Sequence, residues 1–472
     1  MNGLRLFVQR NGLAVALIAA ALLWCHTGWA KEPETAAADL TSIKVLDLQT
    51  AANIALAENP SLEAAQARLA QAREVVRQAR SAYWPRLDLV ASQNRTYLSD
   101  NAYQYQLAIN QALFGPGATL EDPEDLYQAS IGASWLVFDG LARWYKLQSA
   151  KHGEQSVEAA RDDARRLLLR AISNAFLSAQ LALENIAIAK ADESFNQRQL
   201  TEAKLRHEVG TGALSDVLNF EVKANTAKSN RIFSETTYET ARIGLAVLLG
   251  IEQARLPASL ELAALGQALE AELQPPQPEQ SLEEAYSQRP DLMQIDQVVR
   301  QAEADVKVKR GSYYPIVSLS AAYGGETTED YFGFEDEDFG YRLGIDVTFN
   351  IFAGGLFAAQ HQEAKMRLRE AEKNLQSIKL DVTSEVRSTI EDVLSAQKQY
   401  LLLRTNAELV QRNRDLVEKE YKAGVGSLVR LNEAQRDLTA AQVRLATAQV
   451  ALRQAWYDLW SASGQIEAKL VR

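Results

Sequence analysis

The sequence has a single cysteine, Cys25, and only four histidines. Disulfide bonds within one chain are therefore excluded, and thiol chemistry is lost if the N-terminal segment that holds Cys25 is removed. The histidines at positions 152, 207 and 361 lie far apart, and no HExxH, P-loop or GxSxG motif occurs. We therefore expect that the protein is not an enzyme, with no catalytic residue, no metal site and no cofactor.

Long apolar runs are also missing beyond the first 30 residues. No later stretch approaches 18 uninterrupted apolar residues, so any passage through a membrane would have to use strands. Residues 31–472 carry 48 basic and 61 acidic side chains, a formal charge of −13. This acidic balance argues against a nucleic-acid partner, which favours a basic face.

The first 30 residues have the pattern of a secretory signal peptide. Arg5 and Arg10 provide a basic start, an apolar run of about 11 residues follows, and Gly28-Trp29-Ala30 resembles a cleavage site. The run is too short for a transmembrane anchor, which needs ~20 residues. A lipoprotein signal ending at Cys25 is an alternative, although Trp24 occupies a position that favours a small residue. We expect an exported protein.

The chain then repeats itself. Residues 56–93 align without a gap on residues 286–323 at an offset of 230, which places Pro60 on Pro290 and Pro85 on Pro315. The later parts of the two copies align at an offset of 214, so that Gly250 falls on Gly464. Duplication of a whole scaffold favours an architectural role over a catalytic one.

Each copy contains two segments of alternating apolar and polar residues. In residues 341–350 the apolar side chains occupy every second position, and the same holds before residue 324 and in the matching parts of the first copy. Alternation over about ten residues is typical of a tilted membrane strand. A half-buried sheet of a water-soluble protein is the alternative. Aromatic residues gather at one end of each predicted strand and favour a membrane interface, namely Tyr83, Trp84, Trp135, Phe138, Tyr313, Tyr314, Phe349 and Phe352.

The loops that connect the paired strands should lie on the far side of the membrane. Residues 98–127 form the longer one and contain Gly115-Pro116-Gly117. Residues 324–340 form the shorter one and carry an acidic cluster that includes Glu329 and Asp330. The cluster has two interpretations, a solvated loop or a site for divalent cations.

A very long helix is predicted after each strand pair. The segments between Gly140 and Gly210 and between Gly354 and Gly424 lack proline and are rich in good helix formers. Helices of ~65–70 residues would be ~100 Å long. A second helix returns from each glycine turn, and such helices require coiled-coil partners. The proline-rich residues 275–278 join the two copies.

These patterns predict five parts of the chain. They are a signal peptide (1–30), a first repeat (31–250; strands about 85–97 and 128–138, helices about 48–82, 140–207 and 214–249), a linker or equatorial region (251–279), a second repeat (280–464; strands about 315–324 and 340–350, helices about 280–312, 354–421 and 428–463) and a C-terminal tail (465–472).

Four strands cannot close a barrel, and an open edge in lipid leaves backbone groups without partners. The chain must therefore oligomerise. Two copies would give a filled barrel of eight strands, and three would give twelve strands with an open lumen.

The duplicated hairpin and long helix, the Tyr-Trp-Pro and Tyr-Tyr-Pro junctions and the glycine turns together resemble the TolC family of outer-membrane efflux proteins. The resemblance implies a mixed α and β membrane protein. Its homotrimer would form a 12-stranded β-barrel continued by a 12-helix periplasmic α-barrel. It also implies two protein partners, a periplasmic adaptor (membrane fusion) protein and an inner-membrane pump of the RND, ABC or MFS type. The implied location is the bacterial outer membrane, in contact with its lipid and extending into the periplasm.

The resemblance also assigns the helix turns. The adaptor-contact tips would be Val209, Gly210, Thr211 and Gly212 in the first copy and Gly424, Val425 and Gly426 in the second. Ordinary helix-hairpin turns are the alternative, and glycine suits both because it allows a positive φ. A periplasmic gate would lie beside these tips, at Asp216, Tyr421, Arg430 and Glu433. Arg430 departs from the aspartate of some family members, and it is the repeat counterpart of Asp216. We therefore expect these two opposite charges to alternate near the pore mouth and to be able to pair across it.

The expected function is the exit duct of a tripartite efflux system that exports small molecules. Two alternatives remain at the level of sequence. The same duct could serve a type I protein secretion system. A structural coiled-coil spacer would account for the helices but not for the alternating strands with aromatic ends.

Overall fold

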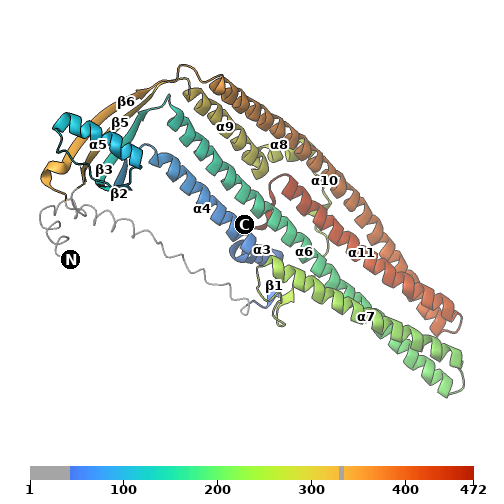
Figure 1. The fold of residues 1–472 in the computed structure, drawn as a ribbon. Coiled ribbons are helices and arrows are strands. Elements are labelled where there is room, and N and C mark those ends of the chain that lie inside the picture. The colour runs from blue at the N-terminus through green and yellow to red at the C-terminus, as the bar shows by residue number, and fades with distance from the viewer. Residues whose placement is uncertain (1–42, 329–333, 472) are drawn as a thin grey trace. The chain divides into compact units, whose positions relative to one another are not determined.

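The computed structural model describes residues 43–328 and 334–471 (Figure 1). The predicted signal peptide and Cys25 lie outside these residues. So do Glu329 and Asp330 of the acidic loop. None of the helices in the described part of the chain is both long enough and apolar enough to span a bilayer.

The internal repeat is visible in the length of every long helix. Helices α6 (Ala142–Glu208) and α10 (Leu356–Lys422) each have 67 residues, and their bounds differ by 214 at both ends. Helices α7 (Leu214–Leu248) and α11 (Leu428–Ala462) each have 35 residues at the same offset. Each long helix packs against the helix that returns beside it, α6 against α7 and α10 against α11 (Figure 1).

The predicted continuous helices at 48–82 and 280–312 are wrong, because each is two helices. The first consists of α3 (Leu48–Glu58) and α4 (Pro60–Ser81), and the second of α8 (Pro278–Gln288) and α9 (Pro290–Gly311). Proline begins the second helix of each pair. The residue before a proline is pushed out of the helical region, and both Asn59 and Arg289 have extended backbones with ψ of 119° and 122°.

The C-terminal end of α7 packs against the break at Asn59, and the C-terminal end of α11 packs against the break at Arg289. Gly250 and Gly464 follow α7 and α11 with φ of +80°, and each closes its helix with a pair of backbone hydrogen bonds typical of a Schellman turn. The side chain of Asn59 donates a hydrogen bond to the Leu248 carbonyl at 2.8 Å. In the second copy Arg289 donates to the Ala462 carbonyl at 3.0 Å. The two contacts are repeat counterparts with different chemistry.

Alanine at Gly250 is expected to destabilise the fold more than alanine at Gly464. Both substitutions force a side chain into the left-handed region, at about 1–2 kcal/mol. A Cβ atom at position 250 would also lie 2.3 Å from the Glu58 carbonyl oxygen, whereas at position 464 its nearest atom is 3.1 Å away. The added overpacking should cost a further ~1–3 kcal/mol. Thermal unfolding followed by helical circular dichroism in detergent measures the difference, and equal melting temperatures would contradict it.

Buried charges stabilise the contact between Arg289 and the end of α11 in the second copy, which we call the joint. The side chain of Arg289 is 5% exposed and pairs with Asp291 and Glu385, each at 2.6 Å. Burial alone would raise the pKa of the Asp291 carboxyl, but the hydrogen bond and charge of Arg289 outweigh burial, so the pKa is lowered. Arg166 on α6 adds to this lowering. The network connects α6, α9 and α10 near the end of α11.

The four long strands form one antiparallel sheet in the order β2-β3-β5-β6. They are β2 (Arg86–Thr96), β3 (Glu124–Phe138), β5 (Ile316–Thr327) and β6 (Phe339–Thr348). Within the described residues, β2 and β6 each pair along one side only. A separate parallel pair joins β1 (Val45–Leu46) to β4 (Glu261–Leu262).

Several short elements occur where the sequence indicated loops. Residues 98–127 contain helix α5 (Asp100–Phe114), so this segment is not simply a loop. The linker contains β4 and the 3-10 helix η2 (Glu270–Leu273), and it ends as α8 begins at Pro278. Another 3-10 helix, η3 (Asp336–Asp338), precedes β6, and the C-terminal tail contains α12 (Ile466–Leu470).

Candidate functional site

One face of the four-stranded sheet is apolar. The register places Leu89, Ile131, Tyr323 and Tyr341 side by side across the four strands. The adjacent row on the same face is Leu87, Ala133, Ala321 and Leu343. Most of these side chains are exposed in the single chain. A sheet with an exposed apolar face is suited to contact with lipid.

The opposite face is polar. Ser92 donates to Gln128 at 3.3 Å, and Gln128 donates to Glu326 at 3.2 Å, in a chain of hydrogen bonds across three strands. Nearer the helices, the Ser320 hydroxyl donates to Asp346 at 3.0 Å. The alternation in the sequence therefore sorts polar side chains onto one face, which is suited to line an aqueous lumen.

All eight predicted interface aromatics lie at the same end of the strands, where the strands meet the helices. The strand register shows that the start of one strand lies beside the end of the next, because Arg86 at the start of β2 pairs with Ser134, and Ile316 at the start of β5 pairs with Thr348. Six of the aromatics are 43% or more exposed, and Tyr83 and Phe138 are less so. The Trp135 indole donates to the Tyr83 carbonyl at 3.0 Å. The structure brings these residues together, and their contact with lipid remains a prediction.

Sequence reasoning missed Arg143, which organises the same junction in the first copy. Its guanidinium lies 5.2 Å from the centre of the Tyr83 ring and donates to the carbonyls of Ala82 and Val137. The repeat counterpart of Arg143 is Phe357, which makes an edge contact with Tyr313. The Asp139–Arg143 spacing of four residues was the available signal, since the two side chains form an ion pair at 3.4 Å.

The predicted tips have the same backbone in both copies. Gly210 and Gly424 both have φ of +79°. Gly212 and Gly426 are needed for a different reason, because a Cβ atom at either position would approach the preceding helix to 2.9 Å. Val209 at the first tip and Val425 at the second tip are largely exposed. Each tip thus presents an apolar side chain on a tightly constrained turn.

Two of the four predicted gate residues lie close to one another. Tyr421 is half-buried, and the Arg206 guanidinium lies 5.4 Å from the centre of its ring. Burial raises the pKa of the Tyr421 hydroxyl, the charge of Arg206 opposes this, and the nearby Asp216 carboxylate adds to it. The phenol is therefore neutral at physiological pH and can donate a hydrogen bond.

The other two gate residues lie on α11. Arg430 pairs with Glu420 of its own hairpin at 3.4 Å and makes no ion pair with Asp216 in the described chain. Glu433 is exposed. Arg206 and Asp216 of the first copy correspond to Glu420 and Arg430 of the second, so the charges are reversed between the copies. The sequence contained this reversal, but the pairing depends on how the helices face each other.

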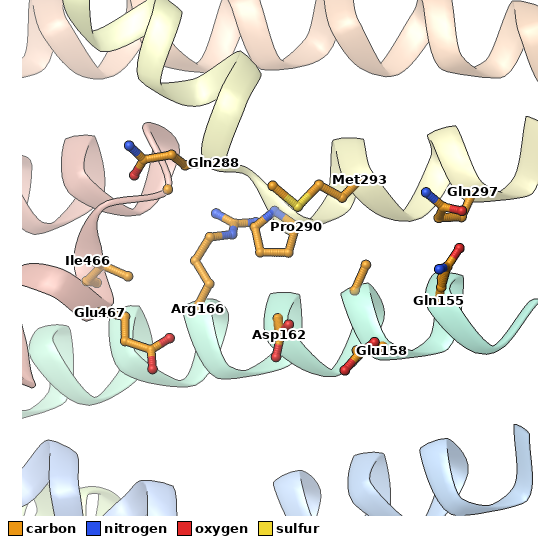
Figure 2. A pocket seen from close by; sticks show the side chains of 12 residues that line it. Gln155, Glu158, Asp162, Arg166, Gln288, Pro290, Met293, Gln297, Ile466 and Glu467 are labelled. Carbon is orange, nitrogen blue, oxygen red and sulfur yellow. The ribbon is translucent and has the colours of Figure 1, made fainter. Parts of the chain in front are cut away.

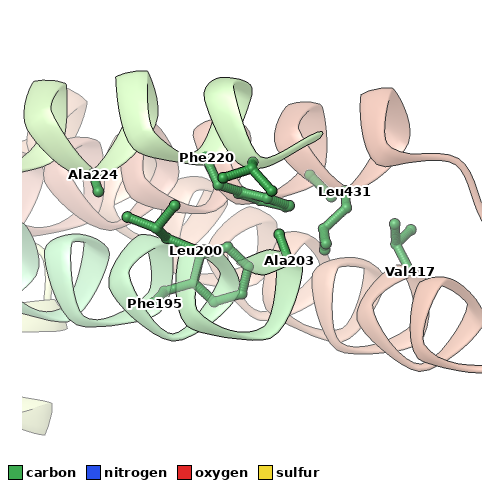
Figure 3. Close-up of a cluster of buried hydrophobic side chains, with 9 residues drawn as sticks. Phe195, Leu200, Ala203, Phe220, Ala224, Val417 and Leu431 are labelled. Atoms are coloured by element: carbon green, nitrogen blue, oxygen red, sulfur yellow. The ribbon is translucent and has the colours of Figure 1, made fainter. Parts of the chain in front are cut away.

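An apolar cluster supports the tips from behind (Figure 3). Phe195 and Leu200 on α6 pack with Phe220 on α7 and with Val417 and Leu431 on α10 and α11. Tyr421 packs against this cluster. The two hairpins are therefore held together within one chain, and the gate residues are attached to a common core.

A cavity of about 450 Å³ lies near the other end of α11 (Figure 2). Figure 2 shows Arg166 rising from α6 toward Pro290, with Glu158 and Asp162 on the same helix. The carboxylate of Asp163 and the hydroxyl of Ser461 accept hydrogen bonds from the Arg166 guanidinium. These contacts bind the helices to one another. The cavity lies between α6, α9 and the residues that follow α11, namely Gly464, Ile466 and Glu467.

Comparison with known proteins identifies matches over most of the chain. The family model described as outer membrane efflux protein matches residues 51–251 and 281–465. The pyoverdine export outer membrane protein OpmQ of Pseudomonas aeruginosa is 26% identical over 87% of this chain and 83% of its own length. The outer membrane protein TolC of Escherichia coli is 24% identical over 83% of this chain and 76% of its own length. The crystal structure of the outer membrane protein VceC of Vibrio cholerae has a TM-score of 0.72 at 18% identity, over 88% of this chain and 96% of VceC.

Proposed function

Because the chain belongs to the outer membrane efflux protein family, whose members are channels and not enzymes, we propose that it is the exit duct of a tripartite efflux system. Its location is the bacterial outer membrane, from which it extends into the periplasm. The duct would export small molecules. It would receive them from an inner-membrane pump of the RND, ABC or MFS type through a periplasmic adaptor protein.

The observation that carries the proposal is the four-stranded sheet with one apolar face and one polar face, whose two edge strands pair on one side only within the described residues. Edges in lipid leave backbone groups without partners at several kcal/mol each, so the sheet requires neighbouring copies. Three copies would supply twelve strands with a lumen lined by the polar face. The long helices would continue this lumen as a barrel of twelve helical columns.

The tips would bind the adaptor. What supports this is their position at the far end of the helices from the sheet and the exposed Val425 on a constrained turn. A surface that is already rigid loses little conformational entropy on binding. At the other end of the molecule, the aromatic residues where the strands join the helices would contact the outer-membrane lipid.

Arg430→Ala is expected to raise the single-channel conductance at low salt. The Glu420–Arg430 pair is exposed on both sides, so its loss should change the stability by no more than about 1 kcal/mol. The repulsion between three uncompensated Glu420 carboxylates should instead favour opening of the gate. The matched control is Arg367→Ala, which removes an exposed ion pair with Glu363 near the other end of α10. Unchanged conductance in Arg430→Ala would remove this residue from the gate.

The experiment that tests the proposal is planar-bilayer conductance of the purified oligomer, together with its mass. A trimer with discrete openings is the expected result. A monomer or dimer without conductance would overturn the duct and favour the coiled-coil spacer. Export of a fluorescent small molecule by a complemented deletion strain distinguishes efflux from type I protein secretion, since a secretion duct would restore export of a protein instead.

A further inference from the structure

The connection between β2 and β3 is longer than its repeat counterpart, and the extra length matches helix α5. Residues 97–123 lie between β2 and β3, and residues 328–338 lie between β5 and β6. The first connection has 27 residues and the second has 11, a difference of 16 that nearly equals the 15 residues of α5. Helix α5 is thus an addition to one copy of the repeat, and a strand pair of this kind forms without it.

Helix α5 has little support from the rest of the chain. None of its 15 residues is buried. In the part of the chain that the structure describes, no other helix or strand packs extensively against it. A helix of this length is only marginally stable in water by itself, and helices in proteins depend mostly on the packing of an apolar face. The surface that covers α5 therefore has to come from outside the described chain.

The two sides of α5 differ in polarity. Tyr105, Ile109 and Leu113 recur every four residues and form an apolar stripe, with exposed fractions of 72%, 39% and 71%. Gln104 and Gln111 are exposed on the opposite side of the helix. The only charged residue of α5 lies in its first turn. The stripe is therefore suited to an apolar surface, and the opposite side is suited to water.

The location of α5 follows from the direction of β2. The long helices extend into the periplasm and join the sheet at the end where Arg86 begins β2, so the other end of β2 points toward the outer leaflet of the membrane. Helix α5 begins at Asp100, four residues after β2 ends at Thr96. The amide of Leu98 donates a hydrogen bond to the Asp122 carboxylate at 3.0 Å, which ties the start of α5 to the start of β3. Figure 1 shows α5 at the sheet end of the molecule, far from the tips.

The apolar face of the sheet is interrupted on β2 where α5 follows. On β3 this face continues to Tyr127, but the residue that pairs with Tyr127 on β2 is Gln93. The next pair on the same face is Arg95 with Asp125, which form an ion pair at 3.3 Å. The opposite face at this level carries Gln128 and is polar. The stripe of α5 therefore resembles the apolar face that β2 lacks here, and it has no match on the polar face.

We propose that α5 is a membrane-surface anchor. Its stripe of Tyr105, Ile109 and Leu113 lies among the acyl chains of the outer leaflet, and Gln104 and Gln111 face the water. The apolar side of such a helix is buried ~5–10 Å into the boundary between headgroups and acyl chains. This inference rests on the proposed function, because that function places the sheet in the outer membrane. It adds a lipid contact outside the sheet, one in each chain, next to the edge strand β2.

The contact is apolar and not electrostatic. No lysine or arginine occurs between Arg95 and Arg143. Helices that bind the anionic headgroups of a membrane carry basic residues on their polar side. The quenching by lipid described below should therefore not depend on salt, because salt screens exposed charges and does not weaken apolar burial.

Site-directed fluorescence in the full chain tests the anchor. Cys25 is the only cysteine, so Cys25→Ser provides a background without thiols. Ile109→Cys and, separately, Leu113→Cys are labelled with an environment-sensitive fluorophore, and the oligomer is reconstituted into phospholipid vesicles that contain spin-labelled lipid. The spin label should quench either fluorophore roughly threefold more strongly than one at Gln104→Cys, the matched control on the polar side. The quenching should be equal at low and at high sodium chloride concentration.

Three results would overturn the anchor. A label at position 109 that reports apolar surroundings but is not quenched by the lipid would place the stripe against another copy of the chain. Equally weak quenching at positions 104 and 109 would place α5 in water. Loss of the quenching at high salt would show that charged headgroups, and not acyl chains, hold the helix.

Conductance of the same labelled oligomers separates this inference from the proposed function. An oligomer that conducts without quenching at positions 109 and 113 would overturn the anchor and leave the duct intact. Quenching at both positions in an oligomer that does not conduct would support the anchor and overturn the duct.

Discussion

Arginine in place of Ala321 is expected to block insertion of the protein into the outer membrane, whereas arginine in place of Ala322 is expected to leave insertion intact. The two alanines are consecutive near the middle of β5 and point to opposite faces of the sheet. Ala321 lies between Ala133 and Leu343 in an apolar row, and Ala322 lies between Gly132 and Arg342. Arginine facing lipid near the bilayer centre costs about 2–4 kcal/mol per copy.

The measurement is the amount of detergent-extracted, heat-modifiable oligomer in outer membranes from cells that express each variant. Ala322→Arg is the matched control, because it adds the same side chain one residue away. Its cost should stay below about 1 kcal/mol per copy, which is the size of an unfavourable cross-strand pair with Arg342. Equal loss in both variants would show that the two faces of the sheet do not differ in their surroundings.

Methionine in place of Arg289 is expected to lower the free energy of unfolding by about 3–5 kcal/mol. The substitution leaves the Asp291 and Glu385 carboxylates without their buried partner and the Ala462 carbonyl without its donor. Arg367→Met is the control, because its ion pair with Glu363 is exposed and should contribute at most about 0.5 kcal/mol. Denaturant unfolding in detergent compares the two. A similar small effect in both variants would mean that the buried network does not stabilise the joint.

The same network should make the protein sensitive to acid. The pKa of Asp291 is lowered in the folded protein, so its contribution to stability is fully present above about pH 4, near the unfolded value. It is lost as the pH falls through the lower, folded value. In Arg289→Met the main cause of the lowering is gone. The melting temperature of the variant should therefore fall less between pH 5 and pH 3 than that of the original protein. A larger fall in the variant would contradict the assignment.

Local patterns account for the parts of the fold that sequence reasoning predicted. The alternating residues of β5 and β6 lie on the expected faces, because a strand places successive side chains on opposite sides whatever its neighbours are. The breaks before Pro60 and Pro290 were also visible in the sequence, and reading each segment as one helix neglected the effect of proline on the residue before it. Helix α5 was missed because the glycines and proline at residues 115–117 pointed to a loop, although Asp100–Phe114 itself contains neither.

Part of the candidate site could likewise be predicted from the sequence, and part could not. The glycines at 210 and 424 could be recognised as turns, because a positive φ is a property of one residue. The contact of Arg206 with Tyr421 and the pairing of Arg430 with Glu420 could not, since each joins residues of two different helices. Arg289 was missed for the same reason, because Glu385 and the Ala462 carbonyl belong to other helices. The spacing of Arg143 from Asp139 was a local signal, but its contact with the Tyr83 ring joins distant segments of the chain. An arginine in a sequence does not show whether its partner is a nearby carboxylate, a distant carbonyl or water.

The sequence by itself determined the duplication, the lengths of the four longest helices and the two faces of the sheet. Each of these follows from periodicity and turn residues within a single segment, where the backbone geometry is repeated from residue to residue. Only the tertiary structure decided which of two equivalent helix faces is covered and which charges are paired. Arg166 is buried and its counterpart Leu380 is exposed, although both occupy the same position of the same helix. Their difference comes from the helices packed beside them, and these lie far away in the chain.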